Sequence, residues 1–223
     1  VFEDRLKYKN VDDKQHYFEE AVHELICPLH ETTDTLGYDD HNLWIIDDNL
    51  AFYTYFASDK TLKSMTGGAD SSTKEPDLAI FDLGLGFNQD GSNEPITIIE
   101  FKRPGRDNYS LSDNPFVQVR EYVKRLREAG VAKSKSGAEI RLIEEHTPFM
   151  CFVVADVTSS LREMMEQFGP FHRKAGHGSF YKWDESFRIF IEVRSCRTRS
   201  FFETQRPGTR PSSISLELMH RRL

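Results

Sequence analysis

The chain has 223 residues, a net charge of −7, and 17 Phe and 8 Tyr residues that can build a hydrophobic core. This length and composition indicate one sizeable folded domain and argue against disorder throughout. Its 3 cysteines, Cys27, Cys151 and Cys196, are widely spaced, which excludes a disulfide framework or zinc site and predicts reduced thiols in a cytoplasmic protein. The longest apolar run, residues 150–155, is too short to span a membrane, so we expect no membrane partner.

The charge is distributed unevenly along the sequence. Residues 1–99 carry 7 basic and 20 acidic side chains, residues 100–127 carry 7 and 4, and residues 194–223 carry 7 and 2. Phosphate contacts need Lys and Arg, so the acidic first part argues against nucleic-acid binding over the whole surface. The distribution instead predicts a local basic surface on an acidic body.

The first predicted elements are a helix and a hairpin. Residues 13–29 place apolar side chains at helical spacing, which predicts an amphipathic helix that ends near Pro28. Residues 43–46 and 50–56, joined by an Asp-Asp-Asn turn, indicate a β-hairpin rich in aromatic residues. Residues 63–75 contain paired Gly and paired Ser residues and are predicted to form a mobile loop.

Two further strands carry charged residues. Asp77 follows a proline and opens an apolar strand, and a second apolar strand starts at Ile96 and ends in Glu100, Phe101 and Lys102. The polar residues 88–95 are expected to form the turn between these strands.

A long helix and a strand–helix–strand sequence complete the predicted domain. Asn114 is expected to cap a helix over Pro115–Ala129, which Gly130 ends. The remaining predicted elements are a surface loop at 133–137, a buried strand at 149–157, a helix at Ser159–Phe168, a loop at 169–178 and a strand at 187–193.

This order of elements predicts an α/β fold with a mixed central sheet flanked by helices. We expect residues 1–203 to form the domain and residues 204–223 to form a basic surface tail with a short helix at 216–223. Trp44 and Trp183 are expected in the core. The chain begins at Val1 and not at a methionine, which indicates a domain of a larger polypeptide.

Asp77, Glu100 and Lys102 form the most informative constellation in the sequence. Glu100 and Lys102 share one strand face because strand side chains alternate, and a charged pair at the end of a buried strand is costly unless it binds something. Carboxylate oxygens suit Mg²⁺ or Mn²⁺, and two carboxylates with a lysine can support metal-assisted phosphodiester hydrolysis. The alternatives are a surface ion pair at the strand end and a turn-capping role for Asp77.

Two helices are expected to add residues to this site. Glu19 lies at the margin of the apolar stripe of the first helix and is our choice for a further carboxylate; Glu24, on the other margin, is the alternative. On the later helix, Gln118 and Tyr122 lie one turn apart on one face. An ordinary amphipathic helix with a packed Tyr122 is the other interpretation.

With these residues the chain resembles the PD-(D/E)xK nuclease superfamily. The resemblance rests on Pro76–Asp77 and Glu100–Phe101–Lys102 as the two signature elements, and on Gln118 and Tyr122 as the Gln-x-x-x-Tyr extension of the RecB-like branch. The residues around Glu19 also resemble the first-helix pattern of Mrr-type members. The likeness covers residues 16–128 and assigns nothing after Pro148.

The resemblance implies a restriction-endonuclease-like fold and Mg²⁺- or Mn²⁺-dependent cleavage of DNA, with RNA as the alternative substrate. Asp77, Glu100 and the Phe101 carbonyl are the expected metal ligands. Lys102, with a lowered pKa, is expected to orient or deprotonate the attacking water or to offset charge on the phosphate. Basic side chains near the site are expected to contact phosphates: Arg103, Arg106, Arg120, Lys124 and Arg125. For each one, a solvated position is the alternative.

Residues 43–46, 57–60 and 100–104 also resemble, more faintly, the C-terminal region of some bacterial proteins that carry an Hsp90-like ATPase module. This second resemblance fits a nuclease effector domain in a larger bacterial protein of phage defence. Restriction-type folds often pair, so a homodimer is a further expectation. The rival functions are an inactive nuclease-fold module that binds nucleic acid or protein, and an assembly domain favoured by the acidic first half.

Overall fold

The computed structural model describes residues 8–10, 15–16, 19–47, 50, 53–81, 94–175 and 178–195. Within these residues the fold is mixed α/β, with one large mixed sheet flanked by helices, which confirms the predicted fold class at that level. The predicted tail at 204–223 lies outside the described residues, as does most of the predicted turn at 88–95.

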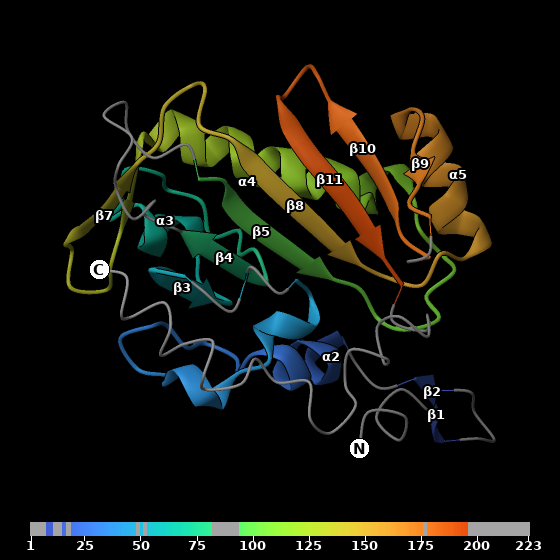
Figure 1. The fold of residues 1–223 in the computed structure, drawn as a ribbon, viewed down its shortest axis with the longest axis horizontal. Helices are drawn as coiled ribbons and strands as arrows, with labels where there is room; N and C mark the ends of the chain where they lie inside the picture. The colour runs from blue at the N-terminus through green and yellow to red at the C-terminus, as the bar shows by residue number, and fades with distance from the viewer. Residues whose placement is uncertain are drawn as a thin grey trace.

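A seven-stranded mixed sheet forms the centre of the molecule (Figure 1). In spatial order its strands are β3 (Tyr55–Ser58), β4 (Leu78–Phe81), β5 (Ile96–Phe101), β8 (Phe149–Val154), β11 (Ile189–Arg194), β10 (Phe180–Asp184) and β9 (His172–Arg173). The three central strands β5, β8 and β11 run parallel, and the outer strands pair antiparallel.

The central strands are buried because helices and loops cover both of their faces. Every residue of β5 is buried, and so is every residue of β8 except Met150. Continuous apolar runs of this kind are typical of parallel strands. Because parallel strands end at the same sheet edge, Lys102 after β5, Asp156 after β8 and Ser195 after β11 lie along one edge.

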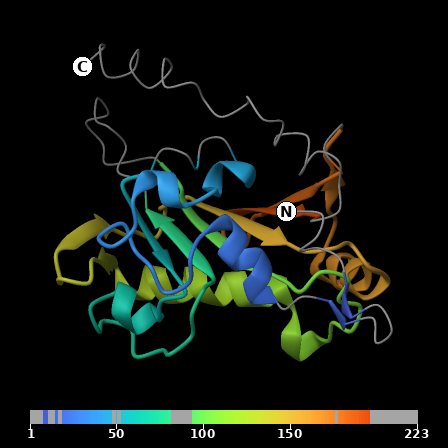
Figure 2. The ribbon, with the colours of Figure 1, turned by 90° about the horizontal axis from the view of Figure 1, so that it is seen from below.

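Helices cover the two faces of the sheet in separate layers (Figure 2). The layer on one face contains α3 (Leu62–Met65), α4 (Pro115–Ala129) and α5 (Ser159–Phe168), and the other contains α2 (Glu19–Ile26) and the 3-10 turn η2 (Leu43–Ile45). Side chains along β5 alternate between two hydrophobic cores, one on each face of the sheet. Ile98 packs in the core under α4 (the α4 core), and Ile99 packs in the core under α2 (the α2 core).

The caps of α4 are those predicted from the sequence. The Asn114 side chain accepts a hydrogen bond from the Phe116 N–H, Pro115 occupies the first turn, and Gly130 ends the helix with a φ of 72°. This left-handed conformation favours glycine because it has no Cβ. The helix Ser159–Phe168 also has its predicted bounds.

Several short elements complete the described chain. They are the hairpin of β6 (Val131–Lys133) and β7 (Glu139–Leu142), the pair β1 (Tyr8–Asn10) and β2 (Gln15–His16), and the 3-10 turns η1 (Tyr38–Asp40) and η4 (Leu111–Asp113). The loop predicted at 133–137 forms the turn of the hairpin β6–β7, and only Lys133 of this range belongs to a strand. No helix in the described ranges combines the length and hydrophobicity needed to cross a membrane.

Two predictions in the first part of the chain are wrong, one in the bounds of a helix and one in the type of element. The helix expected at 13–29 spans only Glu19–Ile26, because Gln15–His16 pair as a strand. The strand expected at 43–46 is the 3-10 turn η2, so the predicted hairpin with residues 50–56 does not form. Short apolar runs fit either a strand or a buried helical turn, and here Leu43 and Ile45 fill the α2 core as a turn.

Three smaller predictions also need correction. The loop expected at 63–75 begins with helix α3, whose Thr61 cap accepts a hydrogen bond from the Ser64 N–H. The loop expected at 169–178 contains the short strand β9, whereas the strand predicted at 187–193 is confirmed as β11. Trp183, expected in the core, is 55% exposed because it lies on the outer strand β10.

Candidate active site

Five side chains from distant parts of the chain meet where the chain leaves β5. They are Glu19 in the first turn of α2, Asp77 directly before β4, Glu100 in β5, Lys102 directly after β5, and Tyr122 in the middle of α4. The structure therefore brings together the three residues of the predicted constellation and the chosen first-helix glutamate. Glu24, the alternative, is exposed on α2.

Strand pairing explains why Asp77 and Glu100 lie side by side. Leu78 pairs with Ile99 in the antiparallel β4–β5 register, so the next position places Asp77 opposite Glu100. The Phe101 backbone N–H donates a hydrogen bond of 2.5 Å to Asp77 Oδ2. This bond fixes the Asp77 carboxyl group against the end of β5.

The Lys102 ammonium group lies between two carboxylates. Its Nζ atom is 2.7 Å from Glu100 Oε1 and 3.2 Å from Glu19 Oε1. The side chains of Lys102 and Glu100 are each 5% exposed, whereas that of Glu19 is 36% exposed. Glu19 therefore closes the cluster on its solvent side.

Burial controls the protonation of the two carboxyl groups on the sheet. It raises the pKa of Asp77 well above its ordinary value; the charge of Glu100 adds to the rise and the Phe101 N–H opposes it. Burial also raises the pKa of Glu100, although the charge of Lys102 opposes this shift. Two carboxyl groups in this arrangement resist simultaneous ionisation unless further positive charge joins them.

The lowered pKa of Lys102 was predicted for a site that holds a metal ion, and in the arrangement without one the pKa is raised. Burial alone would lower the pKa of the ammonium group, but the carboxylates of Glu100 and Glu19 outweigh burial and raise it. The prediction assumed that a bound cation would dominate, whereas the nearest charges in the structure are negative. Lys102 is therefore an ammonium ion at neutral pH.

Tyr122 connects α4 to this cluster. Its hydroxyl donates a hydrogen bond of 3.0 Å to the Glu75 carbonyl oxygen, two residues before Asp77. Burial raises the pKa of Tyr122, and the charges of Glu100 and Asp77 raise it further. One turn earlier on α4, Gln118 has a buried Oε1 with no hydrogen-bond partner.

The oxygen atoms around β5 fit a hard divalent cation. Glu100 Oε2 is buried and has no partner in full hydrogen-bonding geometry, although the Tyr122 hydroxyl lies close to the Glu100 carboxyl group. Asp77 lies opposite Glu100. Carboxylate oxygens with added waters are the ligands that Mg²⁺ prefers. In the described part of the chain no three His, Cys, Asp or Glu side chains form a ready metal-binding group. Lys102 already occupies the space between Glu100 and Glu19.

Two buried polar residues beneath the site were not found from the sequence. His23, one turn after Glu19 on α2, stacks on the Phe101 ring with centroids 5.0 Å apart, and its Nε2 lies 2.9 Å from Ser58 Oγ. Burial lowers the pKa of His23 to about 4, so the ring is neutral. The i, i+4 spacing of Glu19 and His23 is a helical signal for this pair, but Ser58 is brought in only by tertiary structure.

Most of the basic residues predicted to contact phosphates pair within the protein. Arg106 forms an ion pair with Asp113 and lies over the Tyr109 ring. Arg120 donates a hydrogen bond of 2.5 Å to the buried Asp184. Arg103, next to Lys102, is exposed and makes no ion pair in the described ranges.

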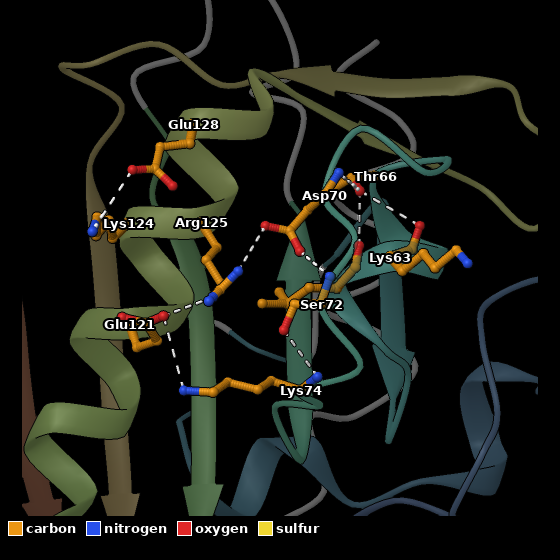
Figure 3. A network of polar contacts seen from close by, with 10 residues as sticks. Lys63, Thr66, Asp70, Ser72, Lys74, Glu121, Lys124, Arg125 and Glu128 are labelled. Carbon is orange, nitrogen blue, oxygen red and sulfur yellow. Dashed lines mark hydrogen bonds and ion pairs between the residues drawn. The ribbon is translucent and has the colours of Figure 1, made fainter.

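Arg125 belongs to a polar network between α4 and the segment after α3, and Lys124 pairs with Glu128 on another side of α4 (Figure 3). Arg125 lies 2.7 Å from Glu121 and 3.4 Å from Asp70, and Lys124 lies 3.8 Å from Glu128. Arg125 therefore ties α4 to the segment after α3. Neither residue joins the cluster around Lys102.

Comparison of the chain with models of known protein families, with curated proteins and with solved structures finds no match in any of the three. Conclusions about function therefore come from the geometry of the site.

Proposed function

We propose that this domain is a restriction-endonuclease-like nuclease of the PD-(D/E)xK type that hydrolyses phosphodiester bonds of DNA with Mg²⁺ or Mn²⁺. The observation that supports it is the meeting of Asp77, Glu100 and Lys102 at one strand end, with Glu100 Oε2 buried and without a partner in full hydrogen-bonding geometry. An unsatisfied buried carboxylate oxygen is costly in a purely structural ion pair. A cation there would satisfy it.

Asp77 and Glu100 would hold the cation, with the Phe101 carbonyl as a third ligand. When bound, the cation would polarise the phosphate and lower the pKa of the attacking water. The bond formed joins the water oxygen to phosphorus, and the bond broken joins phosphorus to the leaving oxygen of the strand. The attacking water gives one proton to solvent, and the leaving oxygen takes one proton from solvent.

Lys102 would act as a fixed positive charge. Because the carboxylates of Glu100 and Glu19 raise its pKa in the metal-free arrangement, we assign Lys102 a charged role and not that of the base that deprotonates water. An ammonium at this position would orient the attacking water and stabilise the negative charge that develops on the phosphate oxygens. Glu19 holds the ammonium from the opposite side, and Tyr122 and Gln118 would support Glu100 or contact the strand.

The wider setting of the domain forms part of the proposal. A nuclease with this site would serve as the effector domain of a larger bacterial protein in phage defence, in the cytoplasm. A homodimer would place two such sites on the two strands of a duplex.

The test is metal-dependent cleavage of plasmid DNA, single-stranded DNA and RNA by the wild type, Glu100→Ala and Lys102→Ala. We expect each substitution to reduce the cleavage rate by roughly 10²–10⁴-fold. Glu94→Ala is the matched control, because Glu94 is exposed just before β5 and its side chain lies outside the cluster. Cleavage that both site variants retain would reject the assignment.

An inactive nuclease-fold module is the second candidate. Lys102 already neutralises much of the charge of Glu100 and Glu19, and the described residues form no ready metal-binding group. For this function we expect binding of DNA without cleavage in Mg²⁺ or Mn²⁺, and no effect of either cation on the melting temperature.

A further inference from the structure

A cavity with about 70 Å³ of water-accessible space lies between strand β3, helix α3 and the hairpin β6–β7. This space holds roughly five water molecules. Its polar lining consists of three lysines and three hydroxyl groups: Lys60, Lys133, Lys135, Thr32, Tyr55 and Ser64. None of the five side chains of the candidate active site lines it.

The three lysines bring positive charge to the cavity, and the Glu75 carboxyl group near Lys60 compensates part of it. Within the described residues none of Lys60, Lys133 and Lys135 forms an ion pair, whereas most basic residues near the candidate active site do. Like charges that line one cavity repel one another. A bound anion would remove this repulsion.

A buried hydroxyl group in the lining also lacks a partner in full hydrogen-bonding geometry. Thr32 is 3% exposed, and its Oγ1 atom has no partner in hydrogen-bonding geometry. Tyr55, 7% exposed, lies beside it; burial raises the pKa of Tyr55, and its hydroxyl interacts with the Thr32 side chain and the Lys135 backbone. Buried hydroxyl groups are normally satisfied by protein, water or ligand atoms.

The backbone holds one of the lysines in place. A Cβ atom on Gly67 would lie 2.6 Å from Lys133 Cδ, so the lysine stem crosses directly over this glycine. Gly67 has a φ of 62°, which favours glycine at this position. Lys133 also lies in β6, which pairs with β7. The lining is therefore built from ordered secondary structure on three sides.

From these observations we propose that the cavity binds a phosphate group, at a site separate from the candidate active site and independent of the proposed nuclease activity. A phosphate group offers several acceptor oxygens and up to two negative charges, which match three ammonium groups and the nearby hydroxyls. The source of the group is a free nucleotide or the backbone of a nucleic-acid strand, and both present the same chemistry.

The test measures binding by calorimetry at constant ionic strength in the presence of a chelator. The probes are inorganic phosphate, ATP and a single-stranded oligonucleotide, and the variant is Lys133→Gln with Lys135→Gln. We expect the affinity for the preferred probe to fall roughly tenfold or more. Lys63→Gln is the matched control, because Lys63 is exposed on α3 and does not line the cavity.

The relative affinities distinguish the sources. Tighter binding of ATP identifies a nucleotide, and tighter binding of the oligonucleotide identifies a strand, provided that the double variant weakens it. Lys60→Gln tests the same cavity from another element, with circular dichroism to confirm folding. Equal affinity of wild type and both variants for every probe, or no binding to the wild type, would overturn the proposal. Glu100→Ala should bind phosphate normally even where the nuclease proposal fails.

Discussion

Lys102 is the residue on which the candidate site depends most directly. A Glu-x-Lys pair at a strand end is often a surface ion pair, but here both side chains are 5% exposed. The pair therefore lies inside the protein, where breaking it would leave an uncompensated charge. The ammonium group compensates Glu100 and Glu19 at the same time, and it links the sheet to α2.

Asp77 should make the metal-free protein less stable as the pH rises. Its pKa in the folded state is raised above the ordinary 3.8, so the unfolded chain loses the proton first. Between these two pKa values the free energy of unfolding should fall by about 1.4 kcal/mol per pH unit. Asp77→Asn keeps an acceptor for the Phe101 N–H and does not titrate. We expect this variant to be more stable than the wild type at neutral pH and inactive as a nuclease.

Urea unfolding in a chelator from pH 4 to pH 8 measures this difference. Asp39→Asn, at an exposed position of η1, is the control and should follow the wild type. Parallel pH curves for the wild type and Asp77→Asn would contradict the assigned burial effect.

The sequence was informative about which residues gather at the site, but less so about their protonation. Alternation placed Glu100 and Lys102 on one face, and helical spacing singled out Glu19. Glu100, two residues away, raises the pKa of Lys102 most, but Glu19, which raises it further, is 83 positions away and could not be read from the local sequence. The partner of His23, Ser58 on β3, was hidden for the same reason.

At the scale of elements, α4 shows what local chemistry can specify. Its cap, its first proline and its terminal glycine are all short-range signals, and the observed bounds agree with them. The strand at 43–46 was predicted wrongly because four apolar residues do not distinguish a strand from a buried turn. The turn of the hairpin β6–β7 was predicted as a loop, but its strands were missed because they have only 3 and 4 residues.

The Asn114 cap should contribute measurably to stability. Its side chain accepts a 2.9 Å hydrogen bond from the Phe116 N–H and is buried, so Asn114→Ala removes a partner that water cannot replace. We expect a loss of about 1 kcal/mol in the free energy of unfolding. Ser110→Ala is the comparison, since the exposed Ser110 makes no cap hydrogen bond. Equal stability of both variants in urea would contradict the role of the cap.

At the scale of the whole molecule, the strand order was beyond the sequence. Strands β5 and β8 are neighbours although α4 and the hairpin β6–β7 lie between them in the chain. Neighbouring parallel strands pair through long crossovers, which leave no local signal. The predicted class, a mixed sheet with helices on its faces, followed from the order of elements alone.

An acidic protein should bind DNA through few phosphate contacts and with a clear salt dependence. For three contacts the affinity should fall on the order of 40-fold between 50 and 200 mM salt. The exposed Arg103 is expected to supply one contact, so Arg103→Ala should reduce the slope of log affinity against log salt by about 1. Fluorescence anisotropy in a chelator measures this slope without cleavage.

Arg173→Ala is the matched control for this measurement. Arg173 is exposed on β9, four strands beyond β5 in the sheet, and should leave the slope unchanged. Equal slopes for Arg103→Ala and the wild type would remove Arg103 from the binding surface.

The 3.2 Å contact between Glu19 and Lys102 has a consequence for how activity arises during folding. A partly folded form that has built the sheet but not docked α2 would keep Asp77 opposite Glu100, yet the lysine would be held from one side only. In such a form the Lys102 ammonium group would not be fixed in its position between the two carboxylates. In the proposed nuclease, newly made chains would therefore acquire hydrolytic competence only when α2 packs against the finished sheet, and cellular DNA would not be exposed to an immature enzyme.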